Sequence, residues 1–179
     1  GAAQGARRPG SRQPVVHVTQ GTQNVDPDDL IRPTLEALAA MDVLVIATTG
    51  LRDRTELPFA VPANARVSDF VPHSELLPHV DVMVTNGGWG GTLAALSHGV
   101  PLVVAGGDLD KPEVAARVAW SGAGVNLKTG RPNAQRVRAA VERVLRDPSF
   151  GTSARTIADE LAACGGVGRA LDLIEQLPA

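Results

Sequence analysis

From Pro14 onward the chain alternates between short valine-rich runs and longer segments whose apolar residues recur at helical spacing. Near-continuous apolar runs, in place of strict alternation, are typical of strands that are covered on both faces, and therefore of a parallel sheet. Six runs predict strands: Val15–Thr19, Asp42–Thr49, Ala65–Phe70, Asp81–Thr85, Pro101–Ala105 and Gly124–Leu127.

The segments between these runs predict amphipathic helices, each with one apolar face. The four faces consist of Leu30, Ile31, Thr34, Leu35 and Leu38; Leu93 and Leu96; Val114, Val118 and Trp120; and Val137, Val141, Val144 and Leu145. Two further helices, roughly Thr152–Ala163 and Val167–Leu177, close the chain without a strand between them. We expect an α/β fold, a Rossmann-like doubly wound parallel sheet of about six strands, with Trp120 packed in its core and no internal repeat.

Composition narrows the classes of partner. The 179 residues, 44% of them hydrophobic, suit one well-packed domain. Seventeen basic and nineteen acidic residues give a net charge of -2, with no basic block after the first dozen positions, so we expect neither nucleic acid nor a membrane as partner. The single cysteine, Cys164, excludes an internal disulfide and a cysteine-built zinc site. A reducing, cytoplasmic setting is expected.

Residues 1–13 are rich in Gly, Ala, Arg and Pro and carry no signal-peptide core. We expect them to be a linker or an expression leader, and residues 14–179 to form a single domain. A flexible leader of this kind indicates that the domain is the second half of a larger protein.

Glycine-bearing loops follow four of the predicted strands: "TQGTQN", "TTGLRD", "TNGGWGGT" and "GGDLDKP". In doubly wound sheets this edge binds ligands. A helix that begins near Trp89 would offer free N–H groups and a positive dipole end to a diphosphate, which can approach only where no Cβ intervenes. The hydroxyls of Thr22 and Thr92 could add donors. A single glycine pair is more often a tight turn, but four such loops favour a ligand site. The spacing matches neither the dinucleotide fingerprint nor a P-loop.

The motifs "VTQGT", "TTG", "FVPHSELLP", "TNGGWGGTLAALSHGVP" and "GGDLDKPEVAARVAWSGAGVNL" occur in an order that resembles the C-terminal, nucleotide-sugar-binding half of bacterial GT-B glycosyltransferases of the macrolide and natural-product type. The resemblance covers nearly everything from Val15 to Leu177. It implies that a nucleobase borders Phe70, Val71, Pro72 and His73, and that Asp110 and Lys111 face the sugar hydroxyls. It implies diphosphate contacts from Gly21, Thr22, Asn86, Gly87, Gly88, Trp89, Gly90, Gly91 and Thr92.

Several positions depart from the pattern of this family. Asn86 stands where many relatives have a phosphate-contacting histidine, and Lys111 replaces a glutamine. Ala94 replaces a glutamate that often holds the ribose hydroxyls, which is weakly compatible with a deoxyribose such as that of dTDP. The identity of the sugar is therefore left open.

The histidines and the Asp108–Asp110 pair offer competing interpretations. His17 lies in an apolar strand and is expected to be structural, His98 to lie in a helix-ending turn, His79 on the surface, and His73 in the site as a binding residue. Trp89 is balanced between packing and lining the crevice. "DLD" could hold a metal, but helix N-termini can neutralise phosphates, so we expect no metal and no other cofactor.

The sequence thus predicts the donor-binding domain of an inverting glycosyltransferase, which moves a sugar from a UDP- or dTDP-sugar to a hydroxyl of a small-molecule acceptor. In relatives the general base lies in the N-terminal acceptor domain, so no catalytic residue is assigned to this chain. The chain alone is expected to be inactive, and to be a monomer or weak dimer. The alternatives are half of a sugar-nucleotide epimerase and a non-catalytic nucleotide-sugar-binding module.

Overall fold

The computed structural model describes residues 12–23, 26–50 and 55–176. Within them six parallel strands form one sheet in the order β3-β2-β1-β4-β5-β6. The strands are β1 (Val15–Thr19), β2 (Leu44–Thr48), β3 (Ala65–Ser68), β4 (Val82–Thr85), β5 (Leu102–Val104) and β6 (Gly124–Asn126). This confirms the doubly wound α/β fold, and each strand falls within its predicted run. The strand order reverses between β1 and β4, so their carboxyl ends flank the position where such folds bind ligands.

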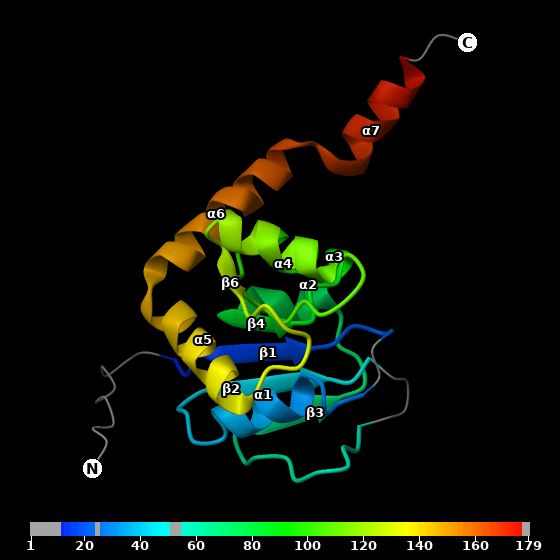
Figure 1. The fold of residues 1–179 in the computed structure, drawn as a ribbon. Helices are drawn as coiled ribbons and strands as arrows, with labels where there is room; N and C mark the ends of the chain where they lie inside the picture. The colour runs from blue at the N-terminus through cyan, green and yellow to red at the C-terminus, as the bar shows by residue number, and fades with distance from the viewer. Residues whose placement is uncertain (1–11, 24–25, 51–54, 177–179) are drawn as a thin grey trace.

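Helices cover both faces of the sheet, as its apolar strands require (Figure 1). On one face α1 (Ile31–Leu38) and α5 (Ala134–Arg146) pack over Val16, Val18 and their neighbours. On the other face α3 (Trp89–Ser97), α4 (Lys111–Trp120) and part of α6 (Pro148–Ala163) enclose a second core around Met83 and Leu102. Successive strand residues point to opposite faces, which is why the central strands β4 and β5 contribute to both cores.

The structure adds two short elements and moves one boundary. The short helix α2 (His73–Leu76) and the 3-10 turn η1 (Leu77–His79) were not predicted, because they span too few residues for a helical period to show. Helix α6 begins at Pro148, four residues before the predicted start, where the Asp147 side chain accepts a hydrogen bond from the Ser149 N–H. Proline suits the first turn of a helix, where its missing N–H has no intrahelical partner.

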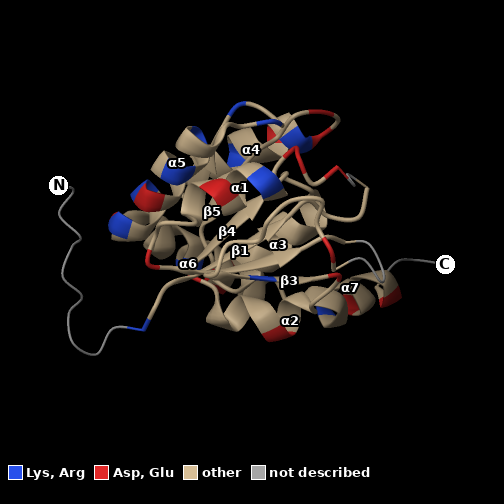
Figure 2. Ribbon diagram, turned by 90° about the horizontal axis from the view of Figure 1, so that it is seen from below, with Lys and Arg blue, Asp and Glu red and all other residues tan. Residues whose placement is uncertain are grey.

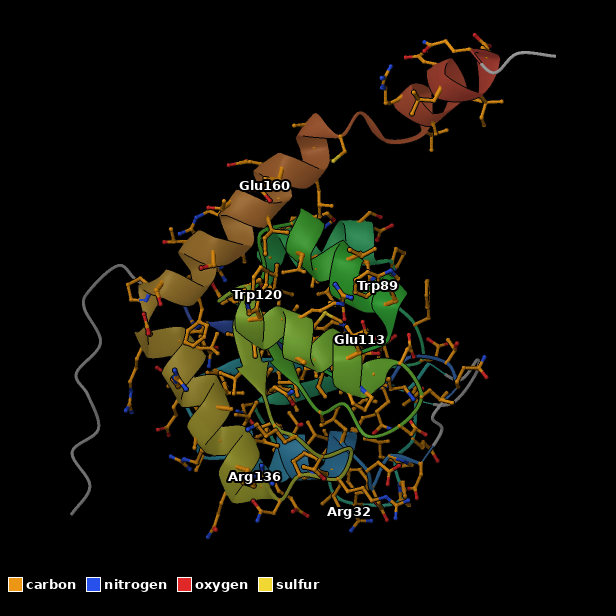
Figure 3. All side chains as sticks on the ribbon, turned by 45° about the horizontal axis from the view of Figure 1, so that its top comes forward. Arg32, Trp89, Glu113, Trp120, Arg136 and Glu160 are labelled. Carbon is orange, nitrogen blue, oxygen red and sulfur yellow. The ribbon has the colours of Figure 1, made fainter. Side chains whose placement is uncertain are left out.

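The prediction that Trp120 packs in the core is wrong. The side chain is 91% exposed, at the C-terminal end of α4 (Figure 3), whereas Val114 and Val118 on the same helix are buried. Trp120 lies two residues beyond Val118, which turns it about 200° around the helix and away from the sheet. It was assigned to the apolar face from its residue type, against the helical period.

The last helix, α7 (Gly166–Glu175), stands away from the body of the domain (Figure 1), and all its residues are exposed. The expected end of this helix at Leu177 lies outside the described residues, as does most of the expected leader. Of that leader, Arg12 forms a 2.8 Å ion pair with Asp81. No described helix is long and apolar enough to span a membrane. Acidic and basic residues are interspersed over the helices (Figure 2), in keeping with the small net charge.

Candidate active site at the carboxyl edge of the sheet

A cavity of about 140 Å³ opens at the carboxyl ends of β1, β2 and β4. It brings together eight residues that were predicted from sequence as site residues: Gly21, Thr22, Phe70, Val71, His73, Asn86, Gly88 and Gly91. They come from three separate loops, which follow β1, β3 and β4. Thr19, Thr48, Gly50, Asp69 and Thr85 complete the lining. The predicted convergence of the glycine loops on one edge is therefore present in the structure.

The glycines of this edge divide into two groups. Some are required by the fold: a Cβ on Gly50 would lie 2.1 Å from the Gly21 carbonyl oxygen, and a Cβ on Gly106 would lie 2.4 Å from that of Lys111. Gly87 has a φ of +85°, and a Cβ there would lie 2.8 Å from Cγ1 of Val104. For these positions the tight-turn interpretation is sufficient.

Gly88, Gly90 and Gly91 belong to the second group, because the fold does not require them. None has a positive φ. A Cβ would meet nothing within 4 Å at Gly90, only the Asn86 Oδ1 at 3.7 Å at Gly88, and ordinary contacts at Gly91. Gly90 and Gly91 lie within α3, where glycine costs about 1 kcal/mol relative to alanine, whereas Gly88 is the N-cap residue, a position that tolerates glycine well. The two glycines in the first turn of α3 therefore call for a reason outside the fold.

The N-terminus of α3 is open, whereas that of α1 is closed by the protein itself. The Gln20 Oε1 accepts hydrogen bonds from the N–H groups of Leu30 and Ile31, at 3.1 and 2.9 Å, and so caps α1. At α3 the N-cap residue is Gly88, and no side chain within the described part of the chain caps it. The first N–H groups of a helix have no intrahelical partners. Those of α3 thus remain available beside the cavity.

Asn86 fixes the loop that leads into α3. Its Nδ2 donates to the Gln20 carbonyl oxygen, and its Oδ1 accepts from the Gly88 N–H at 3.3 Å. Because Asn86 is 8% exposed and bonded at both ends of its amide, it holds the loops after β1 and β4 together. It also separates two cavities, since it lines both of them.

The remaining predicted diphosphate residues are less well placed. Thr92 is fully buried, and its Oγ1 has no hydrogen-bond partner among the described residues. Thr92 does not line the first cavity, and its contact with a diphosphate stays a prediction. Trp89 is half exposed at the start of α3 (Figure 3) and lines neither carboxyl-edge cavity. Pro72, which was predicted to border the nucleobase, is the N-cap residue of α2 and does not line the first cavity.

The second cavity, of about 350 Å³, is lined by the residues of two ion pairs. Lys111 Nζ lies 2.6 Å from the Asp108 Oδ1, and the Arg131 Nε lies 2.6 Å from the Asp29 Oδ1. The hydrogen bond from Lys111, followed by its charge, lowers the pKa of Asp108. Of the two residues expected to face the sugar, Lys111 lines this cavity. Asp110 instead occupies the N-cap position of α4.

Sequence reasoning missed Asp29, Arg131 and Gly130 in this cavity. The loop "LKTGRPN" after β6 carried the same signal as the other four, a glycine following a strand. Gly107 and Gly130 lie back to back, and a Cβ on Gly107 would lie 2.7 Å from the Gly130 Cα. In the described part of the chain no group of three or more His, Cys, Asp or Glu residues could hold a metal ion.

Two histidines lie at the wall of the first cavity. His17 on β1 is fully buried, and its Nδ1 lies 3.0 Å from the Ile46 carbonyl oxygen. Burial lowers the pKa of His17 to about 4, against the opposing effect of that hydrogen bond. His73, half-buried, meets it edge to face with ring centroids 6.0 Å apart. Burial, and to a lesser degree His98, lowers the pKa of His73. His79 is exposed and His98 ends α3, as predicted.

An open helix N-terminus, glycines that the fold does not need and a cavity at the switch point of a doubly wound sheet are features of the α/β proteins that bind phosphorylated ligands. Residues 32–166 match the family described as erythromycin biosynthesis protein CIII-like, C-terminal domain, and the chain belongs to this family.

The curated relatives are glycosyltransferases. The chain is 56% identical over 167 residues to 4'-demethylrebeccamycin synthase of Lentzea aerocolonigenes, covering 93% of this chain and 39% of the relative. It is 43% identical over 171 residues to UDP-glycosyltransferase 2 of Phaeomoniella chlamydospora, covering 93% of this chain and 38% of the relative. The chain thus spans about two fifths of the length of the curated relatives it matches.

Solved structures of glycosyltransferases share the fold. The glycosyltransferase of kitacinnamycin superimposes with a TM-score of 0.82 at 33% identity, over 99% of this chain and 48% of that one. The calicheamicin glycosyltransferase gives 0.83 at 27% identity, over 97% and 46%. A glycosyltransferase solved in complex with dTDP gives 0.74 at 30% identity, over 92% and 42%. These comparisons confirm the resemblance inferred from sequence, and they give no support to the epimerase or to the non-catalytic module.

Proposed function

We propose that this domain binds the nucleoside diphosphate sugar of an inverting glycosyltransferase, with UDP- or dTDP-sugars as donors and a hydroxyl of a small-molecule natural product as acceptor. The observation that carries the proposal is the open start of α3, with three glycines whose Cβ atoms the protein itself would accommodate. A bound diphosphate would explain why these positions are glycine, because it needs the space beside the backbone N–H groups that a Cβ would fill. The relative solved with dTDP supports the choice of ligand class.

The two cavities suggest how such a donor lies. We place the nucleobase beside Phe70, Val71 and His73 in the first cavity, and the sugar in the second cavity near Lys111. The diphosphate then crosses between them over Asn86, within reach of the N–H groups of α3. Gly21 and Thr22 would approach it from the opposite wall. The ion pairs of the second cavity leave polar groups of both signs near the sugar, which suits hydroxyl recognition.

In this arrangement the domain contributes positioning and electrostatic stabilisation. When an acceptor hydroxyl attacks the anomeric carbon, the bond to the diphosphate breaks and negative charge grows on the leaving oxygen. The dipole and N–H groups of α3 lie fixed where that charge develops, so no reorganisation is needed at that moment. We propose that the base that accepts the acceptor proton belongs to a separate acceptor domain, and that no metal takes part.

Titration of the 179-residue chain with dTDP, UDP and ADP, followed by backbone amide NMR shifts, tests the proposal. The amides of residues 21–22, 70–71, 73 and 86–92 are expected to shift together. Pyrophosphate should shift only the amides near α3. Shifts confined to the amino ends of the strands, around Gly99 and Arg155, would place the ligand elsewhere and refute the proposal.

A further inference from the structure

The buried His17 carries a hydrogen-bonding atom that the fold does not use. A carbonyl oxygen only accepts, so the ring nitrogen 3.0 Å from the Ile46 oxygen must carry the proton when the ring is neutral. That tautomer leaves Nε2 as a bare acceptor. Nε2 is buried and has no partner among the described residues. The residues on either side of it on β1 are valines. A valine in place of His17 would not bury an acceptor without a partner, and would not carry the free-energy cost of doing so.

The neighbouring polar ring is that of His73, which lines the first cavity. The two rings meet edge to face, with centroids 6.0 Å apart and an interplanar angle of 72°. In the described structure no hydrogen bond joins them. His73 is the first residue of α2, whose four residues bury no side chain, so its ring is free to adjust by the small distance that a hydrogen bond requires.

We propose that His17 is a positioning residue that selects the tautomer of His73: when the crevice is occupied, one N–H of His73 donates to Nε2 of His17, and its other ring nitrogen faces the ligand as an acceptor. His73 then favours a neutral hydrogen-bond donor of the nucleoside over a phosphate oxygen, which would need an N–H to donate to it. This inference rests on the proposed function, since it assumes that a nucleotide occupies the first cavity.

Two groups of a nucleoside diphosphate offer that chemistry: the N3–H of uracil or thymine, and a ribose hydroxyl. The comparison of UDP with CDP tests the first, because N3 of cytosine is an acceptor. The comparison of dTDP with its 3'-deoxy analogue tests the second. For whichever group is used, the wild-type chain is expected to bind the competent ligand about 5- to 10-fold more tightly, as one hydrogen bond supplies.

The direct test is long-range ¹H–¹⁵N NMR of the histidine rings in the wild-type chain, with and without dTDP. On binding, His73 is expected to become a single neutral tautomer, and the Nε2 signal of His17 to move to that of a hydrogen-bonded acceptor. His17→Phe keeps a planar ring but removes the acceptor. It should return His73 to a mixture of tautomers and abolish the preference between matched nucleotides, while pyrophosphate affinity stays unchanged.

The outcomes separate the two proposals. If no nucleotide binds, the proposed function fails and this inference fails with it. If dTDP binds but the ¹⁵N signals of His17 and His73 do not change, the positioning role is refuted and the proposed function stands. If His17 has only a structural role, the His17→Phe variant will change in thermal stability and keep the nucleotide preference. That result would also refute the positioning role. Should the variant fail to fold, the wild-type spectra still decide.

Discussion

Replacing Gly88 by valine should separate binding from folding. The backbone of Gly88 has φ -61° and ψ 135°, which a β-branched residue adopts readily, and its Cβ would meet only the Asn86 Oδ1, at 3.7 Å. Restricting the unfolded chain stabilises by about 0.4–1 kcal/mol, and a poorer N-cap residue costs a similar amount. We expect the free energy of unfolding to change by less than about 1 kcal/mol.

The same side chain should block the proposed ligand. A phosphate oxygen must come within about 2.9 Å of an N–H nitrogen to form a hydrogen bond, and the valine methyl groups would occupy that space. Charged hydrogen bonds contribute about 1.5–3 kcal/mol each. Loss of one or two at the start of α3 amounts to roughly 1.5–6 kcal/mol, or about 10- to 20,000-fold in the dissociation constant.

Isothermal titration with dTDP and urea unfolding, performed on the same preparations, measure the two effects. Gly168→Val on α7 is the matched control, because its Cβ would meet nothing within 4 Å and it lies on the helix that stands away from the cavities. It should bind dTDP as the wild type does. A folded Gly88→Val with wild-type affinity would refute the cradle at α3.

Four further outcomes are expected. Gly87→Ala should destabilise the domain by about 1–3 kcal/mol in urea unfolding, because its φ of +85° and its contact with Val104 both oppose a Cβ; an unchanged midpoint would contradict this. The pKa of His17 is about 4 in the folded state and about 6.5 in the unfolded state. The unfolded state therefore binds a proton first, and the free energy of unfolding falls as the pH drops from 6.5 toward 4. Between pH 7 and pH 5 His17 should cost about 2 kcal/mol of stability, and His17→Phe should lose that part of the slope. EDTA should leave dTDP affinity unchanged; a loss restored by magnesium but not by sodium would indicate a metal at Asp108. The 179-residue chain should transfer no sugar from UDP- or dTDP-sugars to hydroxylated acceptors by mass spectrometry; robust turnover would mean that it contains a base.

The sheet could be predicted from the sequence because the signal for it is local. Runs such as "VVHVT" and "DVMVT" are almost continuously apolar, as strands buried on both faces are, and the helical period of 3.6 is visible within the segments between the runs. Trp120 shows where residue type misleads: hydrophobicity placed it in the core, while the period placed it on the solvent side of α4. Helix α2 was missed because four residues show no period.

The site could be predicted only in part, because its properties depend on contacts between distant segments. That the loops converge follows from the topology. The topology does not show which glycines the fold needs. Gly87 and Gly88 are neighbours, yet the backbone conformation requires glycine at Gly87 and not at Gly88. The burial of Thr92 and the ion pair of Arg131 with Asp29 likewise depend on packing across the sheet edge.

The neutral side chain of Asn86 joins two loops of the site, a role that a charged residue there would not fill as simply. A neutral amide can donate and accept at once, so a single side chain holds the Gln20 carbonyl oxygen and the Gly88 N–H together. Gln20 in turn caps α1 through its own amide. The two loops that flank the proposed diphosphate site are therefore fixed before any ligand arrives, and binding need not include the entropy cost of ordering them. The N–H groups of α3 supply the attraction for an anion, and the two amides hold those groups in place.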